Sequence, residues 1–230
     1  MMHGPVAGPG GDRYRAGPVS DPQRILVFGG TFDPPHLAHT ELPPLVAQQL
    51  DCDRILYIPA ALNPLKADDP PPTAVHHRLA MLKLAIAGIE NAAIDTIELE
   101  RSGPSYMIDT LHALHDRTPQ AQLRLLIGAD QAVDFHRWRN WQQIIDLATP
   151  AVMLRPPLTQ QAYVAALREA FSPQQVQQWL QWTIPLPMYD ISSTEIRRRL
   201  RDGGELSEIL SAEVVEYIQR HGLYRNGNGG

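Results

Sequence analysis

Short runs of apolar residues alternate with longer segments of helical periodicity from position 24 onward. Runs of this length are typical of buried strands, and the periodic segments are typical of the helices that cover them. The pattern predicts an α/β fold with a doubly wound parallel sheet in a single domain. The predicted strands are 24–28, 54–58, 93–99, 123–127, 151–154 and 184–188, and the predicted helices are 35–50, 75–88, 106–117, 131–147, 160–182, 194–202 and 212–221.

Prolines interrupt this pattern at two places. Pro43 and Pro44 fall inside the first predicted helix, which we expect to kink or restart there because an interior proline removes a hydrogen bond. The proline-rich segment 59–73 follows the second predicted strand. Ligands of open α/β sheets bind beyond the carboxyl ends of the strands, so we expect this segment to form a loop that covers a substrate.

Composition excludes several classes of protein. The 230 residues are 43% hydrophobic, enough for a full core, and the net charge of −5 argues against a nucleic-acid-binding protein. Cys52 is the only cysteine, so no intrachain disulfide can form, and a cytoplasmic location is the default expectation. No apolar stretch is long enough for a membrane span. We expect residues 1–21 and 226–230 to be disordered tails around a domain at 22–225.

The most informative segment is 25–39, where a buried strand is followed by two glycines, two prolines and two histidines. Glycines let another molecule approach the backbone, and prolines in the first turn of a helix cost no internal hydrogen bond. A phosphate group can then accept hydrogen bonds at the positive end of the helix. His36 and His39 lie on one face of that helix, where their rings can bind oxygens that gain charge during phosphoryl transfer.

The spacing of these histidines is not sufficient by itself, and the chain supplies a control. His112 and His115 have the same spacing on a predicted helix, but no glycine turn precedes them. We interpret this second pair as part of an ordinary exposed helix face.

A second candidate segment is Ser192-Ser193-Thr194-Glu195, which is followed by Arg197. A helix cap would explain the serines without any function, with Glu195 reaching back to a free amide. A cation near a helix N-terminus opposes the helix dipole unless an anion lies beside it. Arg197 therefore favours an anion site over a cap alone.

Both candidate segments resemble signatures of the HxGH nucleotidyltransferase superfamily. The first signature is 29–39, in which Ala38 stands where the family has glycine, and the second is 191–197. Between them, 101–111 resembles the Ser-Tyr-Thr-x-x-Thr-Leu motif of nicotinate-nucleotide adenylyltransferases, with Met107 in place of threonine. The segment 128–144 resembles the Gly-x-Asp…Phe…Trp segment of the same family, and the whole resemblance covers about 24–225.

The resemblance implies a Rossmann-like nucleotidyltransferase fold and a role for each matching residue. His36, His39 and Arg197 would act on the phosphates of ATP. Mg²⁺ would arrive with ATP, and no residue is assigned as a metal ligand. The ATP-binding residues would be Gly29, Gly30, Thr31, Phe32, Gly128, Asp130, Ile191, Ser192 and Ser193. The residues that bind the second substrate would be Lys66, Ser105, Tyr106, Met107, Ile108, Trp138 and Arg139.

The function that the resemblance implies is adenylyl transfer from ATP to nicotinate mononucleotide, giving nicotinate adenine dinucleotide and pyrophosphate in NAD biosynthesis. Three alternatives stay open: a sister nucleotidyltransferase that uses nicotinamide mononucleotide or another phosphate acceptor, a zinc hydrolase, and a non-catalytic nucleotide-binding protein. A zinc site needs a third ligand, and none stands at a recognisable spacing from the histidines. We expect no nucleic-acid or membrane partner, and a homo-oligomer stays open.

Overall fold

The computed structural model describes residues 23–62, 71–154, 158–187, 189–202, 204, 206 and 208–224. These residues form a six-stranded sheet in the order β3-β2-β1-β4-β5-β6, with neighbouring strands parallel throughout. The order reverses between β1 and β4, so the predicted doubly wound sheet is confirmed. The strands are β1 (Arg24–Gly30), β2 (Arg54–Pro59), β3 (Ala92–Ile94), β4 (Gln122–Gly128), β5 (Ala148–Met153) and β6 (Thr183–Ile184).

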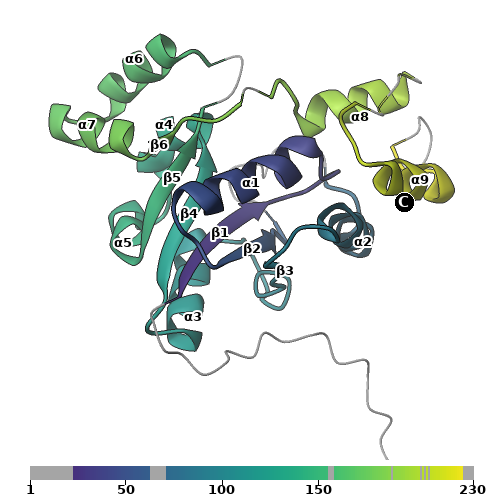
Figure 1. Ribbon diagram of the computed structural model, residues 1–230, viewed down its shortest axis with the longest axis horizontal. Coiled ribbons are helices and arrows are strands. Elements are labelled where there is room, and N and C mark those ends of the chain that lie inside the picture. Colours follow the sequence, from purple (N-terminus) through teal and green to yellow (C-terminus); the bar gives the residue numbers. More distant parts are fainter. Residues whose placement is uncertain are drawn as a thin grey trace, which may run out of the picture.

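Helices cover both faces of this sheet (Figure 1). The helices are α1 (Leu37–Gln49), α2 (Val75–Ile86), α3 (Met107–Arg117), α4 (Ala129–Val133), α5 (Trp141–Leu147), α6 (Gln160–Ala170), α7 (Pro173–Gln181), α8 (Ser193–Arg201) and α9 (Ala212–His221), with a short 3-10 helix, η2 (Phe135–Arg137).

Consecutive residues of a strand face opposite sides of the sheet, and each side has its own core. On β1, Ile25 and Val27 pack into the core that α3, α5, α6 and α7 cover, whereas Leu26 and Phe28 pack into the core that α1 and α2 cover. All four side chains are at most 5% exposed. Because both faces are buried, the strands are continuous apolar runs in the sequence.

Helix α1 continues through Pro43 and Pro44, so the predicted restart is wrong. Pro43 has no N–H to donate to the carbonyl of His39, four residues earlier. The hydroxyl of Tyr57 on β2 donates to that carbonyl instead, with 3.0 Å between the two oxygens. The packing of α1 against the sheet therefore replaces the hydrogen bond that the proline removes.

Two predicted helices are divided in the structure. The helix predicted at 131–147 is instead divided among α4, which begins two residues earlier, η2 and α5, because Trp138 has an extended backbone and Asn140 is left-handed with a φ of 54°. The segment 160–182 divides into α6 and α7 at Ser172, whose hydroxyl accepts a hydrogen bond from the N–H of Gln175 and caps α7.

Two predicted strands are shorter than expected. The strand predicted at 93–99 ends as β3 before Asp95, whose carboxylate accepts a hydrogen bond from the N–H of Ile97 at 3.0 Å and turns the chain. The strand predicted at 184–188 is limited to the two residues of β6. Pro185 and Pro187 follow it, and proline cannot donate to a sheet.

A third, smaller core joins α2, α8 and α9 at one end of the molecule (Figure 1). It contains Met81, Ile196, Val214 and Ile218, all at most 2% exposed. The carbonyl of Ile209, which precedes α9, accepts a hydrogen bond from the first N–H of α1 at 3.0 Å. The C-terminal part of the chain is therefore attached directly to the start of α1.

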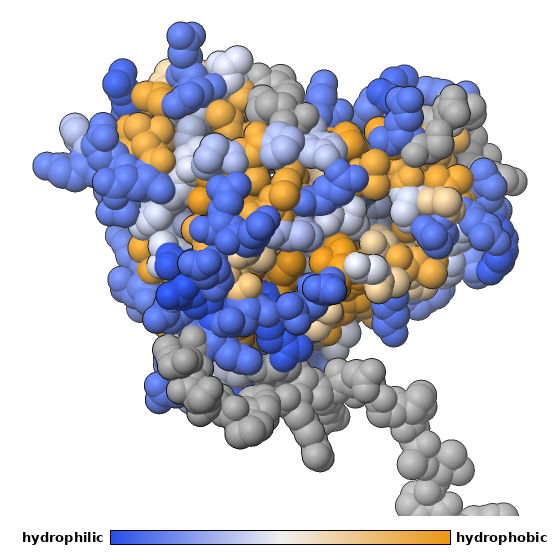
Figure 2. Space-filling model, viewed as in Figure 1, coloured by the Kyte–Doolittle hydropathy of each residue, from blue (hydrophilic) through white to orange (hydrophobic). Residues whose placement is uncertain are grey.

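Within the described ranges, no helix is both long and apolar enough to cross a membrane. Hydrophilic residues cover much of the face shown in Figure 2, with apolar areas between them.

Candidate active site

The candidate site lies at the carboxyl ends of β1 and β4, where the strand order reverses. β1 ends at Gly29 and Gly30, and a Cβ on Gly30 would lie 3.0 Å from the ring of Phe32. Phe32 adopts a φ of 51°, which is uncommon for residues other than glycine, and its ring is 2% exposed. The side chain of Phe32 therefore belongs to the core, and only its backbone is available to a nucleotide.

His36 and His39 lie side by side at the N-terminus of α1, as their spacing predicted. Their ring centroids are 3.6 Å apart, and the ring planes are inclined by 21°. The N–H of His36 donates to Nδ1 of His39 at 3.2 Å, so Nε2 of His39 carries the proton of the neutral ring. By contrast, His112 and His115 are exposed on α3, which confirms their interpretation as part of an ordinary helix face.

Hydrogen bonds connect the two predicted signature segments, which are far apart in the sequence. Nη1 of Arg197 donates to the carbonyl of Asp33 at 2.7 Å, and the hydroxyl of Ser193 donates to the carbonyl of Pro34 at 3.0 Å. The carboxylate of Asp33, a residue that is 5% exposed, accepts a hydrogen bond from the hydroxyl of Tyr224. The end of the chain thus holds the loop between β1 and α1.

Ser192 caps α8, because its hydroxyl accepts a hydrogen bond from the N–H of Glu195 at 3.2 Å. Glu195 does not reach back to a free amide. Its carboxylate accepts hydrogen bonds from Arg198 and Arg199, which lower the pKa of Glu195 to about 2. In the described part of the chain, Arg197 forms no ion pair, and its contact with the carbonyl of Asp33 places its guanidinium beside the loop between β1 and α1, where a phosphate could meet it.

A cavity of about 330 Å³ opens beside Gly29 and Gly30. Its volume lies at the lower end of the range for small-molecule sites. Five further residues from the sequence analysis line it: Ser105, Tyr106, Met107, Trp138 and Arg139. Glu98, Gln131 and Arg137 also line it and were not predicted. The cavity thus unites the two middle motifs, although they are separate in the sequence.

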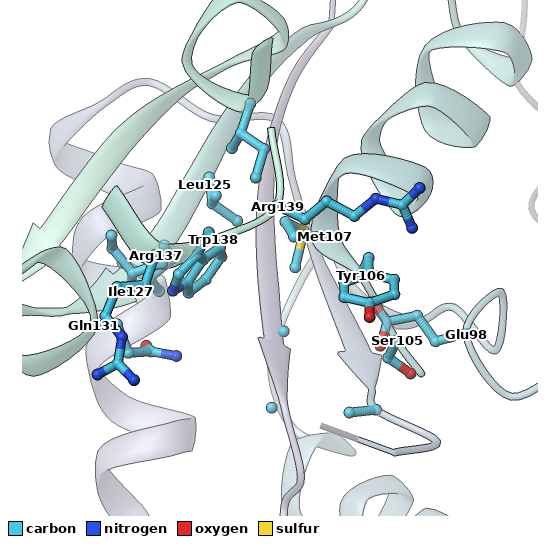
Figure 3. A pocket seen from close by; sticks show the side chains of 15 residues that line it. Glu98, Ser105, Tyr106, Met107, Leu125, Ile127, Gln131, Arg137, Trp138 and Arg139 are labelled. Atoms are coloured by element: carbon cyan, nitrogen blue, oxygen red, sulfur yellow. The ribbon is translucent and has the colours of Figure 1, made fainter. Parts of the chain in front are cut away.

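Trp138 forms one wall of this cavity, and Tyr106 lies across from it (Figure 3). The indole of Trp138 stacks on the ring of Phe135, with centroids 4.7 Å apart. The guanidinium carbon of Arg139 lies 4.9 Å from the centroid of the Tyr106 ring. Among the described residues, no group accepts a hydrogen bond from the buried Nε1 of Trp138. Two aromatic walls with nearby cations can hold a flat, negatively charged ligand.

Met107 fills the space above the end of β1. A Cβ on Gly29 would lie 2.9 Å from Cε of Met107. The space that Gly29 leaves is therefore taken up by a methyl group of this chain, where the sequence indicated an approaching ligand. The unbranched Met107 side chain can adopt other rotamers when a ligand enters the cavity.

Glu98 was not predicted as a site residue. It is 4% exposed, and its carboxylate accepts a hydrogen bond from the hydroxyl of Thr110 at 2.7 Å and another from the hydroxyl of Ser105. Burial raises the pKa of Glu98 in spite of these contacts. Oγ of Ser105 in turn accepts from the N–H of Ala61 at 3.0 Å. In the sequence, Glu98 lies between Ile97 and Leu99, and these two apolar neighbours were the only local sign that its side chain is buried.

The remaining predicted residues have different surroundings. Ile108 is 2% exposed and belongs to the core, whereas Asp130 is exposed on α4, just beyond the end of β4. Lys66, most of the loop predicted at 59–73, and the two predicted tails lie outside the described residues.

Comparison with known proteins gives matches along most of the chain. The model of the cytidylyltransferase-like family matches residues 27–199. A probable nicotinate-nucleotide adenylyltransferase of Bordetella petrii is 40% identical over 205 residues, which cover 88% of this chain and 100% of that protein. A protein of the same description from Gemmatimonas aurantiaca is 35% identical over 202 residues, covering 88% of this chain and 92% of its own.

Solved structures share the fold at lower sequence identity. The nicotinic acid mononucleotide adenylyltransferase of Plasmodium falciparum complexed with NaAD has a TM-score of 0.68 at 19% identity, covering 88% of this chain and 97% of its own. A putative nicotinate-nucleotide adenylyltransferase from Vibrio parahaemolyticus has a TM-score of 0.63 at 18% identity, covering 89% and 96%. With the relatives above, these matches show that the chain is a nucleotidyltransferase and belongs to the nicotinate-nucleotide adenylyltransferases of the cytidylyltransferase-like family.

Proposed function

We propose that this chain transfers the adenylyl group of ATP to nicotinate mononucleotide and releases pyrophosphate. The observation that carries the proposal is the cavity between Trp138 and Tyr106, which opens at the same end of β1 as the stacked pair His36 and His39. The cavity suits the pyridine ring of the acceptor, and the histidine pair suits the phosphates of ATP. Membership of the family supports a reaction between these two substrates.

The reaction depends on positioning and on charge stabilisation, and it needs no protein nucleophile. A phosphate oxygen of the mononucleotide attacks the α-phosphorus of ATP, the bond from that phosphorus to the bridging oxygen breaks, and pyrophosphate leaves. His36 and His39 hold the ATP phosphates at the N-terminus of α1. Nε2 of His39 is a donor for an oxygen that gains charge in the transition state. Arg197 and the Ser192–Ser193 segment act on the β- and γ-phosphates.

The pyridine ring lies against Trp138 in this proposal, because the indole offers the widest flat face in the cavity. Ser105 and Tyr106 line the cavity beside this ring, but their backbone N–H groups already donate to the carbonyls of Leu62 and Pro104. Arg137, which is paired with Asp134 at 3.4 Å, and Arg139 bring positive charge to the lining of the cavity, against the single carboxyl group of Glu98. This balance favours an anionic ring substituent, as nicotinate has, over the neutral amide of nicotinamide.

A divalent metal ion, Mg²⁺ in our proposal, accompanies ATP and neutralises phosphate charge when bound. In the part of the chain that the structure describes, no three His, Cys, Asp or Glu side chains are grouped so that they could hold a metal ion. The carboxylate of Asp33 is already bound to Tyr224. These residues fit a metal ion that the phosphates and water hold, which is the usual arrangement for Mg²⁺ with a nucleotide.

The test is pyrophosphate release by the purified protein with ATP, Mg²⁺ and either nicotinate or nicotinamide mononucleotide. We expect a higher kcat/KM with nicotinate mononucleotide. A preference for the nicotinamide compound would assign the chain to the sister activity instead. Binding of ATP without pyrophosphate release from either acceptor would support a non-catalytic nucleotide-binding protein.

A further inference from the structure

Arg78 on α2 is a buried arginine that lies outside both signature segments. Its side chain is 1% exposed, and burial lowers the pKa of its guanidinium. An apolar residue of similar volume would fill the same space without the cost of desolvating a charge. The hydrogen bonds that Arg78 makes therefore point to a role beyond packing.

The guanidinium of Arg78 donates to three backbone carbonyls from three different segments. Nη1 donates to Thr31 at 2.8 Å and to Ala60 at 3.0 Å, and Nε donates to Thr73 at 2.9 Å. Thr31 belongs to the loop between β1 and α1, Ala60 follows β2 and lines the cavity, and Thr73 lies just before α2. One rigid, planar group thus fixes three segments relative to one another.

The peptide bond that follows Ala60 shows what this contact does to the backbone. In a planar trans peptide, the C=O and the N–H point in opposite directions. The carbonyl of Ala60 is bound to Arg78, and the N–H of Ala61 in the same peptide unit donates to Oγ of Ser105 at 3.0 Å. Arg78 and Ser105 therefore hold this peptide from its two sides.

The same geometry applies to the peptide that joins Thr31 to Phe32. Its carbonyl is bound to Arg78, so the N–H of Phe32 points away from Arg78. Among the described residues, none accepts a hydrogen bond from this N–H. The left-handed backbone of Phe32, with a φ of 51°, and its buried ring maintain this orientation.

We propose that Arg78 is a positioning residue for adenylyl transfer: it orients the Thr31–Phe32 peptide so that its N–H faces the ATP phosphates. It also keeps the Ala60 wall of the cavity in register with that loop. The inference rests on the proposed function, because it assumes that ATP binds at the loop between β1 and α1. Arg78 acts through Thr31 and Ala60 and does not itself contact substrate.

The test compares Arg78→Lys with Arg117→Lys. Arg117 donates to the carboxylate of Asp95 at 2.7 Å, so its replacement also removes a partly buried arginine contact. We expect Arg78→Lys to lower kcat/KM for ATP by about 10- to 100-fold, since a small misplacement of binding groups has effects of this size. Arg117→Lys should lower Tm and keep the kcat/KM of the parent protein.

Hydrogen exchange with and without ATP supplies a readout that does not need turnover. In the parent protein, ATP should slow exchange in peptides that cover residues 31–37, and Arg78→Lys should show much less of this protection. This difference in protection would support the role of Arg78 even if the parent protein released no pyrophosphate. In that case, only the proposed reaction would be wrong. Absence of ATP protection in the parent protein would overturn the inference about Arg78.

Two other outcomes would also overturn it. In the first, Arg78→Lys has a lower Tm, as Arg117→Lys does, but keeps the kcat/KM and the ATP protection of the parent protein. The role of Arg78 would then be structural. If Arg78→Lys does not fold, Arg78→Gln is the second variant, since its amide keeps N–H donors without the charge. Failure of both to fold would mean that Arg78 serves the fold rather than the site.

Discussion

The hydroxyl of Tyr224 donates a hydrogen bond to the carboxylate of Asp33, with 2.5 Å between the oxygens. Tyr224 lies beyond α9, whereas Asp33 lies in the loop that leads from β1 to the histidine pair. Burial and the neighbouring Asp33 raise the pKa of Tyr224, so its hydroxyl keeps its proton at neutral pH. The C-terminal segment therefore completes the phosphate side of the site.

Tyr224→Phe should weaken both stability and ATP use. The substitution leaves a buried carboxylate without one of its donors, which costs about 1–3 kcal/mol in the free energy of unfolding. We expect a higher KM for ATP and an unchanged KM for the mononucleotide, measured by steady-state kinetics. Tyr217→Phe is the matched control, because it removes the hydrogen bond between Tyr217 on α9 and His77 on α2 and leaves the contact with Asp33 in place. Equal effects of both substitutions on the KM for ATP would contradict the role given to Tyr224.

Replacement of His36 by alanine should reduce turnover much more than binding of the mononucleotide. Loss of one donor to a developing negative charge lowers kcat by about 100- to 1,000-fold in other enzymes, and we expect a loss in this range. His112→Ala, an exposed change on α3, should leave kcat unaltered. A purified and folded His36→Ala protein with full activity would remove the histidine pair from the mechanism.

Trp138→Ala should raise the KM for the mononucleotide and leave the KM for ATP nearly constant. The contribution of an aromatic contact, about 0.5–1.5 kcal/mol beyond simple burial, corresponds to roughly 2- to 12-fold in KM. Trp138→Phe keeps a smaller flat ring, so its KM for the mononucleotide should lie between those of the parent protein and Trp138→Ala. Trp141→Phe, at a residue that does not line the cavity, serves as the control. A rise in the KM for ATP alone would place the pyridine ring elsewhere.

Local patterns were sufficient to predict the features of the site that depend on neighbouring residues. The glycine turn, the helix start and the spacing of His36 and His39 are all contained in one short segment, and the structure stacks these two rings. The parallel sheet also followed from local signals, because strands buried on both faces are continuous apolar runs.

Features that depend on distant contacts were not predictable from local patterns. Helix α1 continues through Pro43, and the hydroxyl of Tyr57, on a neighbouring strand, donates to the carbonyl of His39 in place of the missing N–H. The contributions of Glu98 and Arg78 arise only when separate loops meet at the end of the sheet. Nothing in the sequence next to either residue indicated these contacts, because Arg78 follows two histidines and Glu98 lies among other charged residues.

Glu98 gives a prediction about stability and pH. Burial raises the pKa of Glu98 in the folded protein above that of the unfolded chain. The folded state therefore binds more protons between the two pKa values, and this contribution to stability is lost as the pH rises through the folded pKa. Glu98→Gln removes the titration, so its free energy of unfolding relative to the parent protein should increase as the pH rises above about 4.3.

Denaturant unfolding of both proteins at several pH values measures this difference. Glu98→Ala is the companion variant, because it leaves the hydroxyls of Thr110 and Ser105 without their acceptor and should lower the free energy of unfolding by about 1–3 kcal/mol. A pH-independent difference between Glu98→Gln and the parent protein would mean that the carboxyl group titrates normally.

His77 makes stability depend on pH in the opposite direction to Glu98, and it does so at higher pH. Burial and the neighbouring His76 and His221 lower the pKa of His77, and its Nδ1 lies 2.9 Å from the hydroxyl of Tyr217 on α9. The unfolded chain therefore binds a proton more readily than the folded protein. The stability associated with neutral His77 is present above the unfolded pKa, near 6.5, and is lost as the pH falls through the folded value.

We therefore expect the Tm of the parent protein to fall between pH 7 and pH 5, and this fall to be smaller in His77→Gln. Thermal unfolding followed by circular dichroism measures both slopes, and His112→Gln on the exposed face of α3 is the control. Identical pH slopes in the parent protein and in His77→Gln would show that the contact between α2 and α9 does not respond to this histidine.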